Sequence, residues 1–172
     1  MSESVIDAFR YCPRCGTPVE NPGTVPLVCK NCGFQHFFNP IVAVGGIVTD
    51  PEDRVLLVIR ARDPGKGKFG VPGGFVDRGE TLEEALIREV VEETSLKAIE
   101  TSYLCSFPND YTFKGITAPV TDAFFRVEVE SFEPLKAEES EISSFHLCVP
   151  GENELSNMAF ESNRRALETF LK

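Results

Sequence analysis

The segment Gly73–Leu96, which reads GGFVDRGETLEEALIREVVEETSL, constrains the fold and chemistry of this chain more than any other part of it. Thr81 followed three residues later by Glu84 is the pattern of a capping box, so a helix is predicted from Leu82 to Thr94. Three carboxylates of that helix fall within about one third of its circumference: Glu89, Glu92 and Glu93. They continue the face begun by apolar residues of the first turns, which is unusual for a purely structural helix.

Three carboxylates on one helix face carry an energetic cost. Like charges three or four residues apart repel by about 0.2–0.5 kcal/mol per pair, and carboxylates in the last turn oppose the helix macrodipole by about 0.3–1 kcal/mol each. A solvated acidic helix end is the ordinary interpretation of such a run. A divalent cation would remove all of these penalties, and a set of oxygen ligands favours Mg²⁺ or Mn²⁺ over Zn²⁺.

Four of the six cysteines form two C-x-x-C pairs near the N-terminus, and each pair is followed by a glycine. Two tight turns that each supply two thiolates can complete a tetrahedral zinc shell. A redox dithiol or a disulfide pair is the alternative, but two pairs in a chain without a visible export signal favour zinc. A structural zinc ribbon is therefore predicted over residues 1–36, too small to fold without its metal. Its expected ligands are Cys12, Cys15, Cys29 and Cys32.

The remaining cysteines and a nearby histidine receive simpler interpretations. Cys105 and Cys148 stand alone in apolar stretches and are predicted to be small, buried apolar side chains. His36 follows the second cysteine pair, but four cysteines already complete a zinc shell, so it is not expected to be a ligand.

Charge and hydropathy exclude several partners. Acidic residues number 27 against 17 basic ones, for a formal charge of −10; a general nucleic-acid or anionic-membrane binder would be basic. The predicted ribbon is close to neutral, which favours a structural or dimerising element over a nucleic-acid reader. No apolar run approaches the roughly 20 residues of a membrane-spanning helix, and the N-terminus has no apolar core of a secretory signal, so a cytoplasmic location is expected.

The rest of the chain predicts an α+β layered sandwich. Apolar runs at Ile41–Val48 and Arg54–Arg60 flank the turn sequence Thr49–Asp53 and are predicted to form a hairpin. The glycine-rich segment Asp63–Gly74 is predicted to be a loop. Three further strands and a terminal helix are predicted at Tyr103–Phe107, Asp122–Glu130, Phe145–Val149 and Asn157–Leu171.

The segment described first resembles the Nudix hydrolase signature, G-x5-E-x7-R-E-U-x-E-E-x-G-U, in which U is a bulky apolar residue. The positions that match are Gly74, Glu80, Arg88, Glu89, Val90, Glu92, Glu93 and Leu96. The one departure is Ser95, where the family pattern has the glycine that ends the helix. A serine there would cost about 1–2 kcal/mol if the left-handed conformation is kept, so lower local stability is expected, with activity retained.

The resemblance implies a Nudix α/β/α sandwich with a mixed sheet over residues 37–172. It also implies a pyrophosphohydrolase that cleaves a nucleoside diphosphate linked to another group, by attack of water on phosphorus. Glu92, Glu93 and the main-chain carbonyl of Gly73 would hold catalytic Mg²⁺ or Mn²⁺. Glu89 would be a ligand or the base, and Glu80 with Arg88 would brace the loop against the helix. A further carboxylate could come from Glu139 or Glu141, although an acidic surface loop is the simpler interpretation of both.

A zinc ribbon ahead of this motif narrows the resemblance to the NADH pyrophosphatase-like branch. The second motif of that branch, S-Q-P-W-P-F-P-x-S, compares with Ser102–Asp110, where Ser102, Phe107 and Pro108 match. NADH is therefore one candidate substrate beside ADP-ribose, FAD and other dinucleotides. Ribbon-bearing relatives often pair, which admits a homodimer.

Two other functions stay open at this stage. A Nudix-like binding module could sense a nucleotide and use the ribbon to contact a partner, although loss of the acidic residues would be its mark and all of them are present. An RNA-end processing enzyme could remove a dinucleotide cap by the same chemistry, although the acidic net charge disfavours long RNA contacts.

Overall fold

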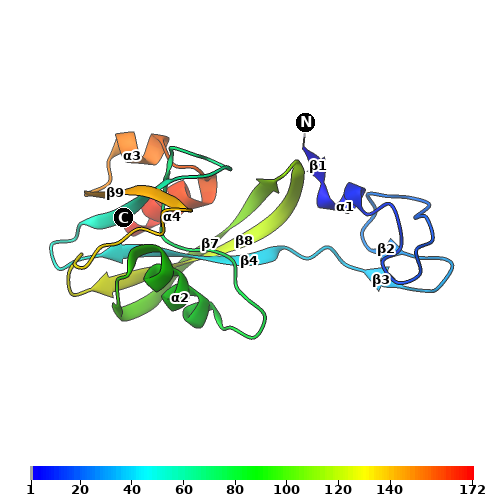
Figure 1. Cartoon of the computed structure of the whole chain (residues 1–172), viewed down its shortest axis with the longest axis horizontal. Helices are drawn as coiled ribbons and strands as arrows, with labels where there is room; N and C mark the ends of the chain where they lie inside the picture. The colour runs from blue at the N-terminus through cyan, green and yellow to red at the C-terminus, as the bar shows by residue number, and fades with distance from the viewer. Residues whose placement is uncertain (1) are drawn as a thin grey trace. The chain divides into compact units, whose positions relative to one another are not determined.

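A computed structural model of the chain describes residues 2–172 and resolves them into two compact units (Figure 1). The described part of the first unit comprises residues 2–41 and Asp110–Val120, and the second unit comprises Val42–Asn109 and Thr121–Lys172. The predicted boundary between residues 36 and 37 stays a prediction. In chain order the elements are β1 (Glu3–Ser4), α1 (Val5–Ala8), β2 (Leu27–Val28), β3 (Gln35–His36), β4 (Ile41–Thr49), β5 (Val55–Arg60), β6 (Phe69–Gly70), α2 (Leu82–Thr94), β7 (Ala98–Phe113), β8 (Ile116–Val129), β9 (Ile142–Cys148), α3 (Glu152–Ser156) and α4 (Glu161–Phe170).

The first unit contains the two cysteine pairs and little regular structure. Strands β2 and β3 pair antiparallel, with Leu27 opposite His36, and β1 pairs parallel with the start of β8. Its buried apolar residues are Cys12, Leu27, Cys29 and Val120. An apolar core this small cannot offset the loss of chain entropy on folding, so the unit needs a further source of stability.

The second unit is built on a sheet in which β5 has several partners. Strand β5 pairs antiparallel with β4, β6 and β9, and β8 lies next to β4 with β7 on its far side. The Val48–Leu56 pairing confirms the predicted hairpin. Together with the parallel β1–β8 pair, these pairings make the sheet mixed, as expected.

Helices cover both faces of this sheet. On one face α2 packs Ala85, Leu86 and Val90 against apolar side chains of β4 and β5. On the other face α4 packs Ala166 and Leu167 against a second set, which includes their sequence neighbours in the same strands. Because successive side chains of a strand point to opposite faces, one hairpin serves both cores. This arrangement, visible in Figure 1, is the predicted α/β/α sandwich.

The element boundaries agree best where local signals are strong. Helix α2 has the predicted bounds, whereas β7 and β8 extend well beyond the segments expected for them. Strand β6 forms inside the predicted loop, and α3 was not expected. The last helix starts at Glu161 rather than Asn157, because the residues just before it bond to Phe69 of β6 through both its N–H and its carbonyl. No helix among residues 2–172 is both long and apolar enough to span a membrane.

The end of α2 carries the strain expected at Ser95. This residue has φ 62° and ψ 12°, the left-handed conformation, while its N–H donates to the Val91 carbonyl. The Ser95→Gly variant is expected to gain about 1 kcal/mol in unfolding free energy, which raises Tm by about 2–4 °C for a chain of this size. Thermal denaturation of the zinc-loaded protein measures it. Ser95→Ala keeps the strain and should gain nothing; an equal gain in both variants would contradict this account.

Candidate active site and zinc centre

The acidic cluster is positioned by the start of α2 and by the loop before it. The Thr81 hydroxyl accepts from the Glu84 N–H at 3.2 Å, while the Glu84 carboxylate accepts from the Thr81 N–H at 2.8 Å. This capping box fixes where the helix begins and therefore which face carries the glutamates. The loop is tied to β4 by three backbone hydrogen bonds, from the Val44 N–H to the Gly74 carbonyl, from the Gly46 N–H to the Pro72 carbonyl and from the Val76 N–H to the Val42 carbonyl.

Glu93 is the most buried carboxylate of the cluster, with 8% of its surface exposed. Its Oε2 accepts a hydrogen bond of 2.9 Å from the Gly73 N–H. Burial raises the pKa of Glu93 to about 8, and the negative charges of Glu89 and Glu141 act in the same direction. The hydrogen bond from Gly73 favours the charged form but does not outweigh burial, and a cation close to the carboxylate would stabilise that form further.

Glu89 lies against the backbone of the loop. A Cβ built on Gly74 would come within 2.6 Å of the Glu89 Cδ, so a side chain at this position would displace the Glu89 carboxylate. Burial raises the pKa of Glu89, and the neighbouring Arg88 opposes this rise.

Arg88 connects the loop to the helix. Its Nε and Nη2 donate to the two oxygens of Glu80 at 2.7 and 2.9 Å, and Nη2 also donates to the Phe75 carbonyl at 3.1 Å. Its Nη1 donates to Glu89 at 2.7 Å and to Glu92 at 3.2 Å. The hydrogen bond to Arg88 is the main cause that lowers the pKa of Glu80 to about 2. Arg88 and Glu80 therefore form a two-pronged ion pair, and their role as a brace stays a prediction.

The backbone at Gly73 is shaped for close contact. Its φ is 152°, and a Cβ there would lie 2.8 Å from the Gly45 Cα and nearer still to the Val44 carbonyl oxygen. The loop accepts hydrogen bonds from β4 through the carbonyls of Pro72 and Gly74, so the carbonyl of Gly73 stays outside that ladder.

Charged side chains from outside α2 also surround the acidic cluster. Of the two carboxylates named from the sequence as coming from a later loop, Glu139 and Glu141, it is the charge of Glu141 that raises the pKa values of Glu89 and Glu93. Glu141 forms an ion pair with Arg62, and the charge of Arg60 lowers the pKa of Glu93. The sequence analysis did not predict that either arginine lies near the acidic cluster, because both are far from α2 in the sequence and no local pattern links them to it.

The donor set of this cluster fits a hard divalent cation. The side chains of Glu89, Glu92 and Glu93 offer only oxygen, and the carbonyl of Gly73 would add another oxygen. A bound cation would also offset the free-energy cost of keeping the Glu93 carboxylate charged while it is buried, which is the cost that raises its pKa. Glu92 is the most exposed of the three carboxylates and remains open to solvent.

The four predicted zinc ligands come together in the first unit. Their Sγ atoms all lie within 4.8 Å of one another, and Cys12–Cys32 and Cys15–Cys29 are both separated by 3.7 Å. A tetrahedral shell with Zn–S bonds of about 2.3 Å has S–S edges of about 3.8 Å, whereas a disulfide would bring them to about 2 Å. In both turns a glycine at positive φ donates its N–H to the carbonyl of the first cysteine. The arrangement therefore fits zinc and not a disulfide.

His36 takes another role, since its ring stacks between the aromatic rings of Phe9 and Phe34. The group of four thiols does not include its ring, and the expectation that it is not a ligand stays a prediction.

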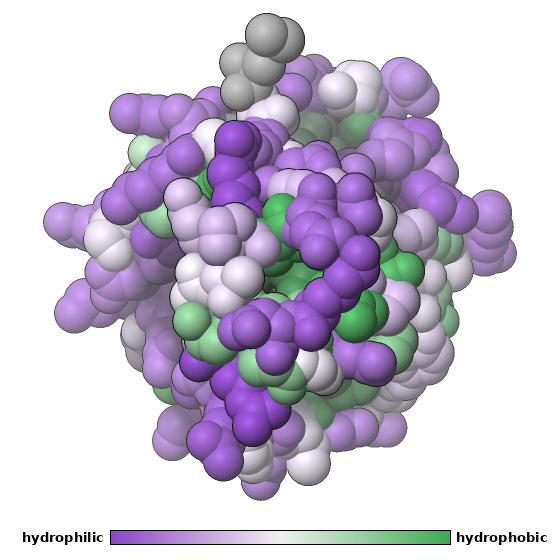
Figure 2. Space-filling view, turned by 90° about the vertical axis from the view of Figure 1, so that its right-hand side faces the viewer, coloured by the Kyte–Doolittle hydropathy of each residue, from purple (hydrophilic) through white to green (hydrophobic). Residues whose placement is uncertain are grey.

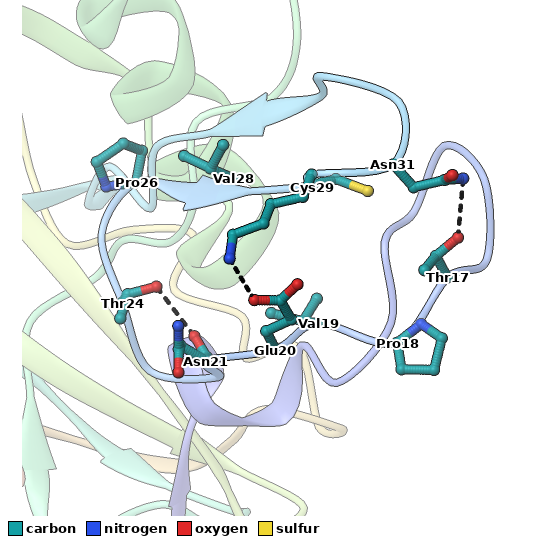
Figure 3. A pocket seen from close by; sticks show the side chains of 11 residues that line it. Thr17, Pro18, Val19, Glu20, Asn21, Thr24, Pro26, Val28, Cys29 and Asn31 are labelled. Atoms are coloured by element: carbon teal, nitrogen blue, oxygen red, sulfur yellow. Dashed lines mark hydrogen bonds and ion pairs between the residues drawn. The ribbon is translucent and has the colours of Figure 1, made fainter.

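A pocket in the ribbon lies between the first cysteine turn and β2 (Figure 3). Two pairs of its lining residues bind each other, Lys30 to Glu20 at 2.5 Å and Asn31 to Thr17 at 3.1 Å. The face turned toward the viewer in Figure 2 is mostly hydrophilic around a small hollow. Arg10 forms a further ion pair with Glu3 at 2.6 Å. Of the three basic side chains of the ribbon, Arg10 and Lys30 are therefore each paired with an acidic residue.

Comparison with known proteins gives one family for the catalytic region. A family model described as "NUDIX domain" matches residues 39–170. An ADP-ribose pyrophosphatase of Methanocaldococcus jannaschii is 48% identical over 63 residues, which are 37% of each chain. An NAD-capped RNA hydrolase, NudC, of Klebsiella pneumoniae is 31% identical over 116 residues, which are 67% of this chain and 44% of that protein. The chain thus spans less than half the length of these curated relatives.

Solved structures give the same fold. A NUDIX hydrolase of Nitrosomonas europaea aligns with a TM-score of 0.64 and 25% identity, covering 92% of this chain and 88% of the other. The NUDIX domain of Shewanella oneidensis NrtR, solved with ADP ribose, also aligns at 0.64, with 22% identity over 78% of this chain and 88% of that domain. At 22% identity, the match to the NrtR domain shows a shared fold and carries no conclusion about function.

Proposed function

The chain belongs to the NUDIX domain family, and from that premise we propose that it is a metal-dependent pyrophosphohydrolase that cleaves a nucleoside diphosphate linked to another group. The observation that carries the proposal is the buried carboxylate of Glu93 beside Glu89 and Glu92, an oxygen-only set whose charges need a cation. ADP-ribose and NAD-like dinucleotides are the first substrates to test, because the printed names of two relatives refer to them.

Glu92, Glu93 and the Gly73 carbonyl would hold Mg²⁺ or Mn²⁺ in this proposal, with Glu89 as a further ligand or as the base. The metal ion would neutralise charge on the diphosphate and lower the pKa of a bound water. A diphosphate repels an incoming nucleophile, so positioning and electrostatics supply most of the catalysis.

The side chains around the ligands hold them in place. Arg88 keeps the Glu89 carboxylate oriented through its 2.7 Å bond and fixes the loop through Glu80. The Gly73 N–H holds one oxygen of Glu93. Glu89 is a stronger proton acceptor than an exposed glutamate because burial raises its pKa.

The test is a substrate screen with Mg²⁺ or Mn²⁺. NADH, NAD, ADP-ribose, FAD, diadenosine polyphosphates and nucleoside triphosphates are compared, and hydrolysis is followed by product separation. We expect metal-dependent cleavage of one dinucleotide class, with a loss of at least about 100-fold in kcat for Glu92→Gln because a charged ligand is removed. Glu83→Gln is the matched control, since Glu83 is an exposed glutamate of the same helix and should keep full activity.

The outcomes separate the alternatives left open by the sequence. If folded, zinc-loaded protein hydrolysed none of these substrates, the proposed enzymatic function would be wrong and the nucleotide-sensing module would remain. Equal activity in Glu92→Gln would remove that residue from the site. A competition between NAD-capped RNA and the free dinucleotide distinguishes an RNA-end enzyme, and preference for the capped RNA would overturn the expectation that nucleic acid is not a partner. The homodimer and the cytoplasmic location stay predictions.

A further inference from the structure

A second group of metal-binding side chains lies outside both sites described above. His146 and Cys148 belong to β9 and Glu154 belongs to α3, and one donor atom from each lies within 4.8 Å of the other two. The sequence predicted Cys148 to be a buried apolar side chain, yet it is only partly buried and faces two other ligand types.

The group is on the sheet face opposite to α2. Residues two apart in a strand share a face, and Cys148 packs against the α4-side core together with Phe69 and Leu155. The ring of His146 stacks on that of Phe69, with centroids 5.1 Å apart. The acidic cluster belongs to the helix on the other face, so the two groups are separate. Figure 1 shows α3 beside β9.

The carboxylate of Glu154 is held toward the histidine. Its Oε2 accepts from the Gly151 N–H at 2.9 Å, and its Oε1 accepts from the side-chain amide of Asn153 at 3.1 Å. The same Oε1 lies 3.4 Å from Nε2 of His146. Hydrogen bonds that orient a carboxylate in this way are the usual support of a metal ligand.

The geometry and donor chemistry both suit zinc. Zn–N and Zn–O bonds of about 2.0–2.2 Å in a tetrahedron place nitrogen and oxygen about 3.4 Å apart, which is the separation between His146 and Glu154. Imidazole, thiolate and carboxylate together are typical zinc ligands, whereas Mg²⁺ prefers oxygen alone. The side chain of His146 is 40% exposed, so solvent reaches this group of ligands.

We propose that His146, Cys148 and Glu154 form a second zinc site, with three protein ligands and one solvent position. It would bind α3 to the end of β9 across the short connection between them. The proposal does not depend on the function proposed above, since no substrate or catalytic residue enters it.

Cobalt spectroscopy tests this site directly. The full chain is dialysed against a weak chelator until one zinc per chain remains in the four-cysteine centre, and Co²⁺ is then added in the presence of excess Mg²⁺. We expect one Co²⁺ per chain with a thiolate-to-cobalt charge-transfer band in the near ultraviolet. The acidic cluster has no sulfur and cannot produce this band, whereas unchanged zinc content shows that the ribbon has not exchanged its metal.

Single substitutions assign the ligands. Cys148→Ser should abolish the band, while Cys105→Ser, which alters the other isolated and partly buried cysteine, should leave it intact. His146→Asn and Glu154→Gln should each weaken Co²⁺ binding at least tenfold, since even a ligand's hydrogen-bond partner contributes that much. Added Zn²⁺ should displace Co²⁺ and remove the band. No band in the parent protein, the same band in Cys148→Ser, or Co²⁺ that zinc does not displace would overturn the proposal.

Discussion

Without its catalytic cation, the zinc-loaded protein is expected to lose stability as the pH rises, because of one buried carboxylate. The pKa of Glu93 is raised from 4.5 to about 8 in the folded chain. Between these values the folded state keeps a proton that the unfolded state has lost, so the free energy of unfolding falls with rising pH. The stabilisation is complete below about pH 4.5 and gone above about pH 8. Across the whole window the change is roughly 3–5 kcal/mol.

Glu93→Gln removes the titrating group while its amide oxygen can still accept from the Gly73 N–H. Urea unfolding between pH 5.5 and 8.5 should therefore show a much flatter stability profile in this variant than in the parent protein. Glu83→Gln, which alters an exposed glutamate of the same helix, should keep the parent slope. A parent-like slope in Glu93→Gln would show that another group causes the pH dependence.

A divalent cation should reverse the loss in the parent protein alone. Mg²⁺ at 100 times its dissociation constant stabilises a folded state that binds it by about 2.7 kcal/mol. At a fixed Mg²⁺ concentration the gain should be larger at pH 8 than at pH 5.5, because at the lower pH Glu93 holds a proton that must leave before the cation binds. In Glu93→Gln this gain should nearly vanish. An equal response in the two proteins would place the cation elsewhere.

The parts of the fold that were predictable from sequence depend on local signals. Thr81 and Glu84 fix the start of α2, and its end at Ser95 follows from the family pattern, so both bounds agree. The predicted hairpin has two dense apolar runs around a turn. The predicted strand within β7 was too short because the additional residues of β7 include exposed polar ones, among them Glu100, Ser102 and Asp110, which give no clear apolar alternation. The additional residues of β8, Ile116–Thr121, are partly or fully buried, but they include Pro119, and proline argues against a strand interior.

Other features depend on pairs of residues far apart in the chain. The late start of α4 follows from bonds between residues just before it and β6, which sequence patterns do not reveal. Arg62 and Glu141 are 79 positions apart yet form an ion pair next to the acidic cluster. The spacing of Glu89, Glu92 and Glu93 on one helix was visible, but the burial that raises the pKa of Glu93 arises only in the folded chain.

Removing zinc from the four-cysteine centre is expected to unfold the first unit. Structural zinc in small domains contributes about 10–16 kcal/mol of apparent binding free energy, and this unit has almost no apolar core to replace it. A strong chelator should therefore expose the thiols of both cysteine pairs to a thiol reagent and open residues 12–36 to limited proteolysis. Metal analysis before treatment should find zinc in this centre.

Cys15→Ser should reproduce the effect of the chelator, because it removes one of the four ligands, whereas Cys105→Ser should not. If the predicted boundary between residues 36 and 37 is correct, the second unit should resist the protease and keep hydrolysing a free dinucleotide after chelation. Iron in place of zinc, or four freely titratable thiols in a protease-resistant ribbon, would contradict the zinc centre. Loss of hydrolysis together with the ribbon would instead show that the two units fold as one, since the ligands of the acidic cluster all lie in the second unit.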